Sequence, residues 1–282
     1  MKVRIGLALG GQGMLRLEDF DGVLDRLEAL GFDSVWLPET FLAGTIDPLV
    51  GLAYAAARAR RLKIGTHIVG PGRNPISLAK SLAQLDRLSK GRLLLVFVAG
   101  LGDASERAAQ GMTEGDRTQW FDEQLPRLRQ WWGGEAVDGL MLDSRPIQDP
   151  LEVWLGGQAT KALERVGRLG DGWIPGRITR HEAVAARTVI ERAASEAGRV
   201  ISGEHFGINL TYGWDADAMI PPIRGTGDAS DVVSLGAVAL RENVQRWIEV
   251  GFTKIVARPL RPPADWAAEL DRLAETVLDL QT

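Results

Sequence analysis

Eight short apolar segments alternate with eight amphipathic segments along the chain, and this alternation constrains the fold more than any other feature. The apolar segments have the length and residue types of strands, and the amphipathic ones carry apolar residues at helical spacing. The expected strands are Val3–Leu9, Ser34–Leu37, Ile64–Val69, Leu93–Val98, Leu151–Leu155, Gly172–Ile174, Phe206–Leu210 and Lys254–Ala257. Strands that alternate with helices form a parallel sheet covered by helices.

The number of units selects an architecture within this class. Eight strand-helix units in 282 residues predict an α/β protein of the (β/α)8 TIM-barrel type, which usually needs about 250 residues. No linker interrupts the pattern, so we predict a single domain over residues 1–282. Residues 211–236 are rich in Gly, Pro and Asp and are expected to form a long loop. An open, doubly wound sheet is the alternative, although eight units would be long for one.

Composition excludes several classes of function. The chain has no cysteine, which rules out thiol catalysis, disulfides and cysteine metal sites. Its three histidines are scattered without the spacing of a metal site. A formal net charge of −4 leaves no basic surplus for nucleic acid. The N-terminus does not resemble a signal peptide and no apolar run matches a membrane helix, so we expect a cytoplasmic protein without nucleic-acid or membrane partners.

In such a barrel the active site lies at the C-terminal ends of the strands, so the residues after each expected strand are the candidates. The clearest of these segments is the turn Gly156-Gly157-Gln158-Ala159-Thr160. Its glycines allow a ligand to approach the backbone closely, the next helix offers free N–H groups, and Thr160 adds a hydroxyl. The turn suits a phosphate; the alternative is a tight strand-to-helix turn without a ligand.

Five other candidates lie at or just after the ends of expected strands. The small-residue turn Ala99-Gly100-Leu101-Gly102 either passes under a planar ring system or is a plain loop. Glu39 and His67 each stand where a carboxylate or a neutral imidazole can relay a proton, although a surface carboxylate and a hydrogen-bonded histidine are the more common cases. Arg73 and Arg258 are placed to neutralise an anion. Together these residues indicate a phosphorylated, planar cofactor in the barrel mouth.

Longer segments carry a resemblance to one known family. Leu30–Glu39 resembles the end of its first helix and its second strand, and Arg73–Arg92 resembles its third helix and the strand that follows. Pro150–Gly157 and Gly170–Trp173 resemble its fifth and sixth units. The family is that of the bacterial-luciferase-like flavin and deazaflavin oxidoreductases. The resemblance runs from residue 3 to about residue 175 and returns weakly at Leu240–Ala257.

The resemblance implies a luciferase-like TIM barrel that binds FMN or coenzyme F-420 at its C-terminal mouth, with Gly156-Gly157 and the next helix start holding the phosphate. It implies a bulge near His67-Ile68, often with a non-prolyl cis peptide, and a homodimer packed through the early helices. A composition rich in Ala, Arg and Gly resembles that of actinobacterial proteins, in which the deazaflavin is common, and this favours coenzyme F-420 over FMN. The expected cofactor-binding residues are His67, Ile68, Ala99, Gly100, Gly156, Gly157, Gln158 and Thr160, with His67 or Glu39 as the catalytic proton relay.

The function that the resemblance implies is an oxidoreductase that acts on a small organic substrate. With coenzyme F-420 it transfers a hydride, and with FMN it activates O2 as a monooxygenase. Val96, Val98 and His67 stand where the family often has small residues, and they motivate an alternative, a non-catalytic flavin- or ligand-binding barrel of the same fold. Thr40 follows Glu39 where the sugar-phosphate dehydrogenases of the family carry an acid-histidine pair, so that activity is not expected.

Overall fold

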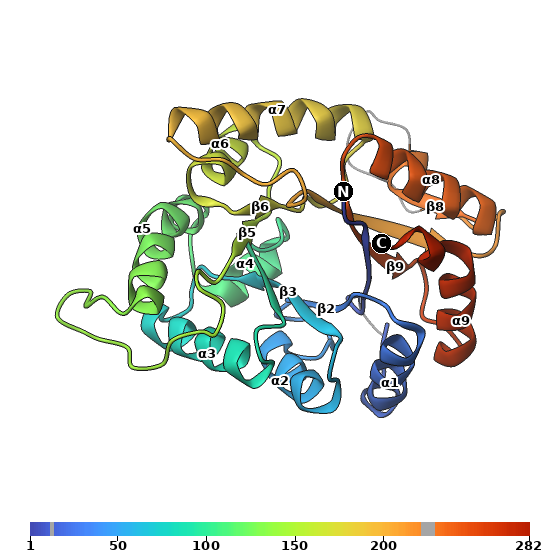
Figure 1. Cartoon of the computed structure of the whole chain (residues 1–282), viewed down its shortest axis with the longest axis horizontal. Coiled ribbons are helices and arrows are strands. Elements are labelled where there is room, and N and C mark those ends of the chain that lie inside the picture. Colours follow the sequence, from blue (N-terminus) through green and yellow to red (C-terminus); the bar gives the residue numbers. More distant parts are fainter. Residues whose placement is uncertain (12–13, 221–228) are drawn as a thin grey trace.

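The computed structural model describes residues 1–11, 14–220 and 229–282. Its strands form one parallel sheet in the order β6-β5-β4-β3-β2-β1-β9-β7-β8. A parallel bridge between Trp173 and Phe206 joins β6 to the start of β7, so that eight strands close into a barrel. The helices surround this ring, and the two termini lie near each other on it (Figure 1). The predicted TIM-barrel architecture is therefore confirmed.

All eight expected strands are present with small shifts at their ends. They are β1 (Arg4–Ala8), β2 (Ser34–Pro38), β3 (Lys63–Val69), β4 (Leu93–Val98), β5 (Val153–Leu155), β6 (Gly172–Trp173), β7 (Gly207–Gly213) and β9 (Lys254–Pro259). The segment 211–236, predicted as a loop, contains the end of β7 and a further strand, β8 (Val233–Leu235), which pairs with Thr211–Gly213. Three residues within a Gly- and Asp-rich stretch give too short a pattern to indicate a strand. Residues 221–228 of that segment lie outside the described residues.

The helices cover the outside of the barrel. In the described ranges they are α1 (Phe20–Leu30), α2 (Pro48–Arg58), α3 (Pro75–Leu88), α4 (Ala104–Gln110), α5 (Glu114–Gly133), α6 (Thr160–Leu169), α7 (Arg180–Glu196), α8 (Ala237–Glu249) and α9 (Trp266–Val277). Asp47 and Asn74 cap α2 and α3 through their side chains, each followed by proline at the first helical position. None of the described helices combines the length and the apolar character that crossing a bilayer requires.

Two indoles fill the barrel interior below its mouth. Trp36 on β2 is 1% exposed, and a Cβ added to Gly65 on the neighbouring strand would collide with its ring. A Cβ on Gly172 would likewise lie 2.5 Å from the indole of Trp154 on β5. Glycine at these positions lets large and small residues alternate around the barrel, so the interior is a packed core rather than a channel.

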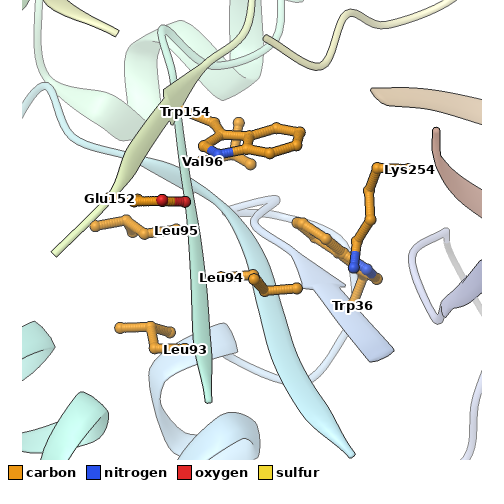
Figure 2. Close-up of a pocket in the computed structure, with 8 residues that line it drawn as sticks. All are labelled: Trp36, Leu93, Leu94, Leu95, Val96, Glu152, Trp154 and Lys254. Atoms are coloured by element: carbon orange, nitrogen blue, oxygen red, sulfur yellow. The ribbon is translucent and has the colours of Figure 1, made fainter. Parts of the chain in front are cut away.

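A buried charge cluster lies at the opposite end of the barrel from the mouth. Lys254 opens β9 and is 2% exposed, and its ammonium group contacts the carboxylate of Asp33, which directly precedes β2. The other oxygen of Asp33 accepts a hydrogen bond from Lys63 at 3.1 Å. Figure 2 shows the Lys254 side chain beside the Trp36 indole, with 5.7 Å between the ammonium nitrogen and the ring centroid. A cavity lined by Lys254, Trp36, Trp154 and residues of β4 measures about 20 Å³, room for roughly one water molecule.

Burial and pairing act in opposite directions on the charges of this cluster. Burial alone raises the pKa of Asp33, but attraction to Lys254 and Lys63 outweighs it and holds the pKa at about 2. Burial lowers the pKa of Lys254 to about 8, and the neighbouring carboxylate of Asp33 opposes this change. The ion pair therefore keeps two buried groups charged at neutral pH.

Candidate functional site

A cavity of about 590 Å³ opens at the C-terminal ends of the barrel strands. The residues that follow β1, β2, β4 and β5 form its walls, together with side chains of β3, β9, α5 and α6. This volume is in the range of pockets that hold a cofactor or a drug-sized ligand. The structure brings together six of the predicted site residues on its lining: Glu39, His67, Ala99, Gly100, Gly156 and Gly157.

The other three predicted residues lie close to the cavity in the chain but do not line it. Ile68 is fully buried in the core between the barrel and its helices. Gln158 is exposed and donates a hydrogen bond from Nε2 to the carbonyl of Arg177 at 2.8 Å. Thr160 is exposed at the first position of α6. Of the predicted site residues, those in the Gly156-Gly157 turn and at the strand ends therefore form the cavity wall.

Strand β3 runs through the site without distortion. His67 pairs with Pro38 on one side and with Val96 on the other, and Ile68 continues the register opposite Phe97. In the described backbone, the cis peptide precedes Pro150. The bulge and non-prolyl cis bond that the family resemblance implied near His67-Ile68 are therefore wrong, since an unbroken ladder leaves no extra residue there.

His67 lies on the floor of the cavity, directly above the barrel core. Its ring centroid is 5.2 Å from that of Trp36. The Nε2 atom is buried and has no hydrogen-bond partner among the described residues. Burial lowers the pKa of His67 to about 4, so the imidazole is neutral at pH 7. A buried polar atom without a partner is a group that a bound ligand can satisfy.

The buried imidazole predicts a pH dependence of stability. In the unfolded chain the pKa is about 6.5, against about 4 in the folded protein. Between these values the unfolded chain binds a proton that the folded protein does not, so His67 lowers stability as the pH falls through this window. Urea unfolding of the wild type and of His67→Gln from pH 4 to 8 should show this loss in the wild type alone. A His67 pKa near 6.5 by NMR, or the same pH dependence in both proteins, would contradict it.

Glu39 is held by partners inside the protein. Its Oε2 atom accepts a hydrogen bond from the Val69 N–H at 2.6 Å, and its Oε1 atom contacts the Arg73 guanidinium. Burial raises the pKa of Glu39, and Arg73 and the Val69 N–H only partly offset this effect. Arg73, which the sequence placed as an anion-neutralising residue, is thus engaged with Glu39. Of the two predicted proton relays, both carboxylate oxygens of Glu39 have partners, whereas Nε2 of His67 has none among the described residues.

The glycine turn after β5 presents bare backbone to the cavity. A Cβ on Gly156 would lie 2.8 Å from Val98 Cγ1, and one on Gly157 would lie 2.9 Å from Ala162 Cβ. Gly157 also has φ of +108°, which favours glycine. The buried Trp173 fixes the turn by donating from Nε1 to the Gly157 carbonyl at 2.9 Å. Side chains larger than hydrogen are therefore excluded from this part of the wall.

The first turn of α6 adjoins these glycines. Its N-cap residue, Ala159, offers no side-chain hydrogen bond, whereas side-chain oxygens cap α2 to α5, α7 and α9. A helix start without a capping side chain keeps N–H groups available for an anion.

The turn after β4 is fixed by side chains of the two helices that follow it. The Ala99 carbonyl accepts hydrogen bonds from Gln110 Nε2 at 3.3 Å and from Arg117 Nη1 at 3.1 Å. Gly100 has φ of +89°, and a Cβ on it would lie 3.2 Å from the Gln110 side-chain oxygen. Gln110 lies in α4, a short helix without a strong apolar pattern, so its contact with this turn left no signal in the sequence.

The bulky residues of β4 leave the cavity open. Val98 lines the cavity, but Val96 is 1% exposed and packs in the barrel interior with Trp36. Trp214 borders a separate hollow near α9 and donates a hydrogen bond to Glu269 at 2.7 Å. The described residues contain no cluster of three or more side chains that could hold a metal ion.

The chain matches known proteins over most of its length. The model of the luciferase-like monooxygenase family matches residues 3–219. An uncharacterized protein of Mycobacterium tuberculosis is 29% identical over 252 residues, covering 84% of this chain and 78% of its own. An F420-dependent secondary alcohol dehydrogenase, solved with an F420-acetone adduct, has a TM-score of 0.82 at 19% identity with 100% of both chains covered.

A second solved structure shows the same fold with a different cofactor. The oxygenating constituent of 3,6-diketocamphane monooxygenase from Pseudomonas putida, solved with FMN, has a TM-score of 0.77 at 16% identity and covers 100% of this chain and 99% of its own. These likenesses confirm the fold, and the family match confirms the relationship expected from the sequence segments. The chain belongs to the luciferase-like monooxygenase family.

Proposed function

We propose that the protein is an oxidoreductase that binds coenzyme F-420, or alternatively FMN, in the 590 Å³ cavity and acts on a small organic substrate. One observation carries this proposal. A single cavity combines a floor formed by His67, with an unpartnered Nε2, and a wall of bare glycine backbone next to an uncapped helix start. The first feature suits a planar ring system and the second suits its phosphate.

The residues of the cavity fit both the phosphate and the ring system of such a cofactor. Gly156, Gly157 and the first turn of α6 would hold the phosphate, because both glycines line the cavity next to a helix start that no side chain caps. Ala99 and Gly100 would lie along the ring, where their small size leaves room above the strand ends. The relatives solved with F420 and with FMN support a cofactor of this kind. The actinobacterial character of the composition favours F-420.

The bound cofactor would supply the hydride chemistry, or the reaction with O2 in the case of FMN. The protein's own residues orient it and exclude water. Apolar side chains of Leu101, Phe121 and Leu155 line the cavity and lower its dielectric. The imidazole of His67 is neutral, so it can take up or release a proton at a ring nitrogen as the substrate reacts. Glu39 would position the β3 end through its bond to Val69.

A titration tests the proposal. Purified protein is titrated separately with coenzyme F-420 and with FMN, and binding is followed by fluorescence. We expect saturable binding of F-420 with a Kd on the order of micromolar and weaker binding of FMN. Binding of FMN alone would instead support the monooxygenase form of the proposal, and binding of neither would contradict it.

The alternative of a non-catalytic barrel has less support. It was motivated by bulk at Val96, Val98 and His67, yet Val96 does not line the cavity and the other two leave about 590 Å³ open. It would regain support if a cofactor bound but no reduction or oxidation of any small carbonyl or alcohol substrate occurred. The homodimer, the cytoplasmic location and the absence of nucleic-acid partners stay predictions.

A further inference from the structure

One charged residue of the cavity has no counter-charge within the described part of the chain. Among the described residues, three charged side chains line the cavity. Glu39 is paired with Arg73, and Arg165 is paired with Asp122 at 2.9 Å. Arg258, near the C-terminal end of β9, forms no ion pair with any described carboxylate; its one hydrogen bond there runs from Nη2 to the Thr211 hydroxyl at 3.4 Å.

The exposed guanidinium of Arg177 acts electrostatically on Arg258. Arg177 follows β6 and likewise forms no ion pair with a described residue. Burial lowers the pKa of Arg258, and the charge of Arg177 lowers it further. A partly buried guanidinium without a counter-charge is unfavourable unless an anion joins it.

The position of Arg258 separates it from the glycine turn. In the sheet order, β9 lies between β1 and β7, and β7 joins β6 through the bridge at Trp173. The end of β9 is therefore three strands away from the end of β5, where Gly156 and Gly157 face the cavity. A cofactor phosphate at the glycine turn would leave Arg258 on another side of the barrel mouth.

We propose that Arg258, which contacts the Thr211 hydroxyl, binds an oxyanion of the substrate, so that the substrate is a small organic acid or a phosphate ester. This inference rests on the proposed function, because it assigns the substrate to the part of the cavity that the cofactor leaves open. A guanidinium donates two parallel hydrogen bonds to a carboxylate or a phosphate, which fixes the orientation of a small molecule. The oxyanion would hold the reacting carbon of the substrate toward the centre of the mouth.

The test uses inorganic phosphate and acetate as probes on protein saturated with the cofactor that it binds. Their affinities are measured by calorimetry for the wild type, Arg258→Gln, Arg258→Lys and the distal control Arg241→Gln, whose arginine is paired with Asp279 on the surface. We expect Arg258→Gln to weaken anion binding by about tenfold or more, as for the loss of a charge-assisted hydrogen bond. Arg258→Lys should retain more of the affinity, and Arg241→Gln all of it. Stronger binding of phosphate would indicate a phosphate ester, and stronger binding of acetate a carboxylic acid.

Three results would overturn the inference. In the first, the wild type binds neither probe in any measurable range. In the second, Arg258→Gln binds both probes as the wild type does. In the third, the same variant loses affinity for the cofactor by the factor it loses for the anion, which would make Arg258 a cofactor contact. If no cofactor binds at all, the proposed function fails first. Anion binding to the free protein and its dependence on Arg258 can still be measured, so the two failures are distinguishable.

Discussion

Replacing Asp33 with asparagine is expected to lower the free energy of unfolding by about 3–5 kcal/mol, the usual effect of removing one partner of a buried ion pair. Lys254 is 2% exposed, and Asp33 is the carboxylate that contacts its ammonium group in the described structure. The substitution would leave a buried cation without its counter-charge at the base of the barrel. Urea unfolding at pH 7, followed by tryptophan fluorescence, measures the change.

Two further proteins make this prediction specific. Asp279→Asn removes an exposed partner of Arg241 and should change stability by less than about 1 kcal/mol, as surface pairs do. The double substitution Asp33→Asn and Lys254→Met removes both charges and should recover much of the loss. A loss no larger in Asp33→Asn than in Asp279→Asn would show that the buried pair does not stabilise the barrel.

The low pKa of Asp33 predicts that the folded protein loses stability in acid. In the unfolded chain its pKa is about 3.9, and in the folded protein about 2. The unfolded chain therefore binds the extra proton between these values. The stabilisation by Asp33 is fully present above about pH 4 and is lost as the pH falls toward 2. Asp33→Asn should lack this part of the acid transition.

Gly157→Asp is expected to weaken cofactor binding by about a hundredfold or more, roughly 2.7 kcal/mol. Three effects act in the same direction. The φ of +108° at Gly157 strains any other residue, and the new Cβ would lie 2.9 Å from Ala162 Cβ. The carboxylate would also stand at the start of α6, where we place the cofactor phosphate, and two anions there repel each other. Fluorescence titration with F-420 or FMN measures the loss.

A matched control separates charge at the mouth from charge at the turn. Gly102 lies in the exposed loop after β4, and a Cβ added to it would meet open space. Gly102→Asp introduces the same carboxylate near the mouth but away from α6, so it should leave cofactor affinity within about threefold of the wild type. If Gly157→Asp binds the cofactor as tightly as Gly102→Asp, the phosphate does not lie at the glycine turn.

The strands and most helices could be predicted from sequence because each has a strong local pattern. Leu93–Val98, for example, is apolar throughout, as a strand buried on both faces must be, and Asn74 before Pro75 marks a helix start. β8 could not be predicted, because its three residues become a strand only by pairing with the end of β7. That interaction depends on the closed barrel and not on the local sequence.

The site was predictable only in part, for a similar reason. The rule that strand ends form the mouth was enough to place Glu39, His67 and the glycine turn on one cavity. Nothing local shows that Arg73 neutralises Glu39, or that Lys254 and Asp33, 221 residues apart, pair beneath the site. Ion pairs between distant strands follow from the three-dimensional closure and leave no spacing signal.

The packed interior below His67 has a consequence for how ligands exchange. Trp36, Trp154 and Lys254 close the barrel beneath the mouth, so a ligand cannot pass through the barrel and must enter and leave at the mouth. When two ligands occupy this cavity together, the ligand on the floor has to bind first and dissociate last. Turnover would then follow a compulsory order, and a trapped outer ligand would hold the inner one in place.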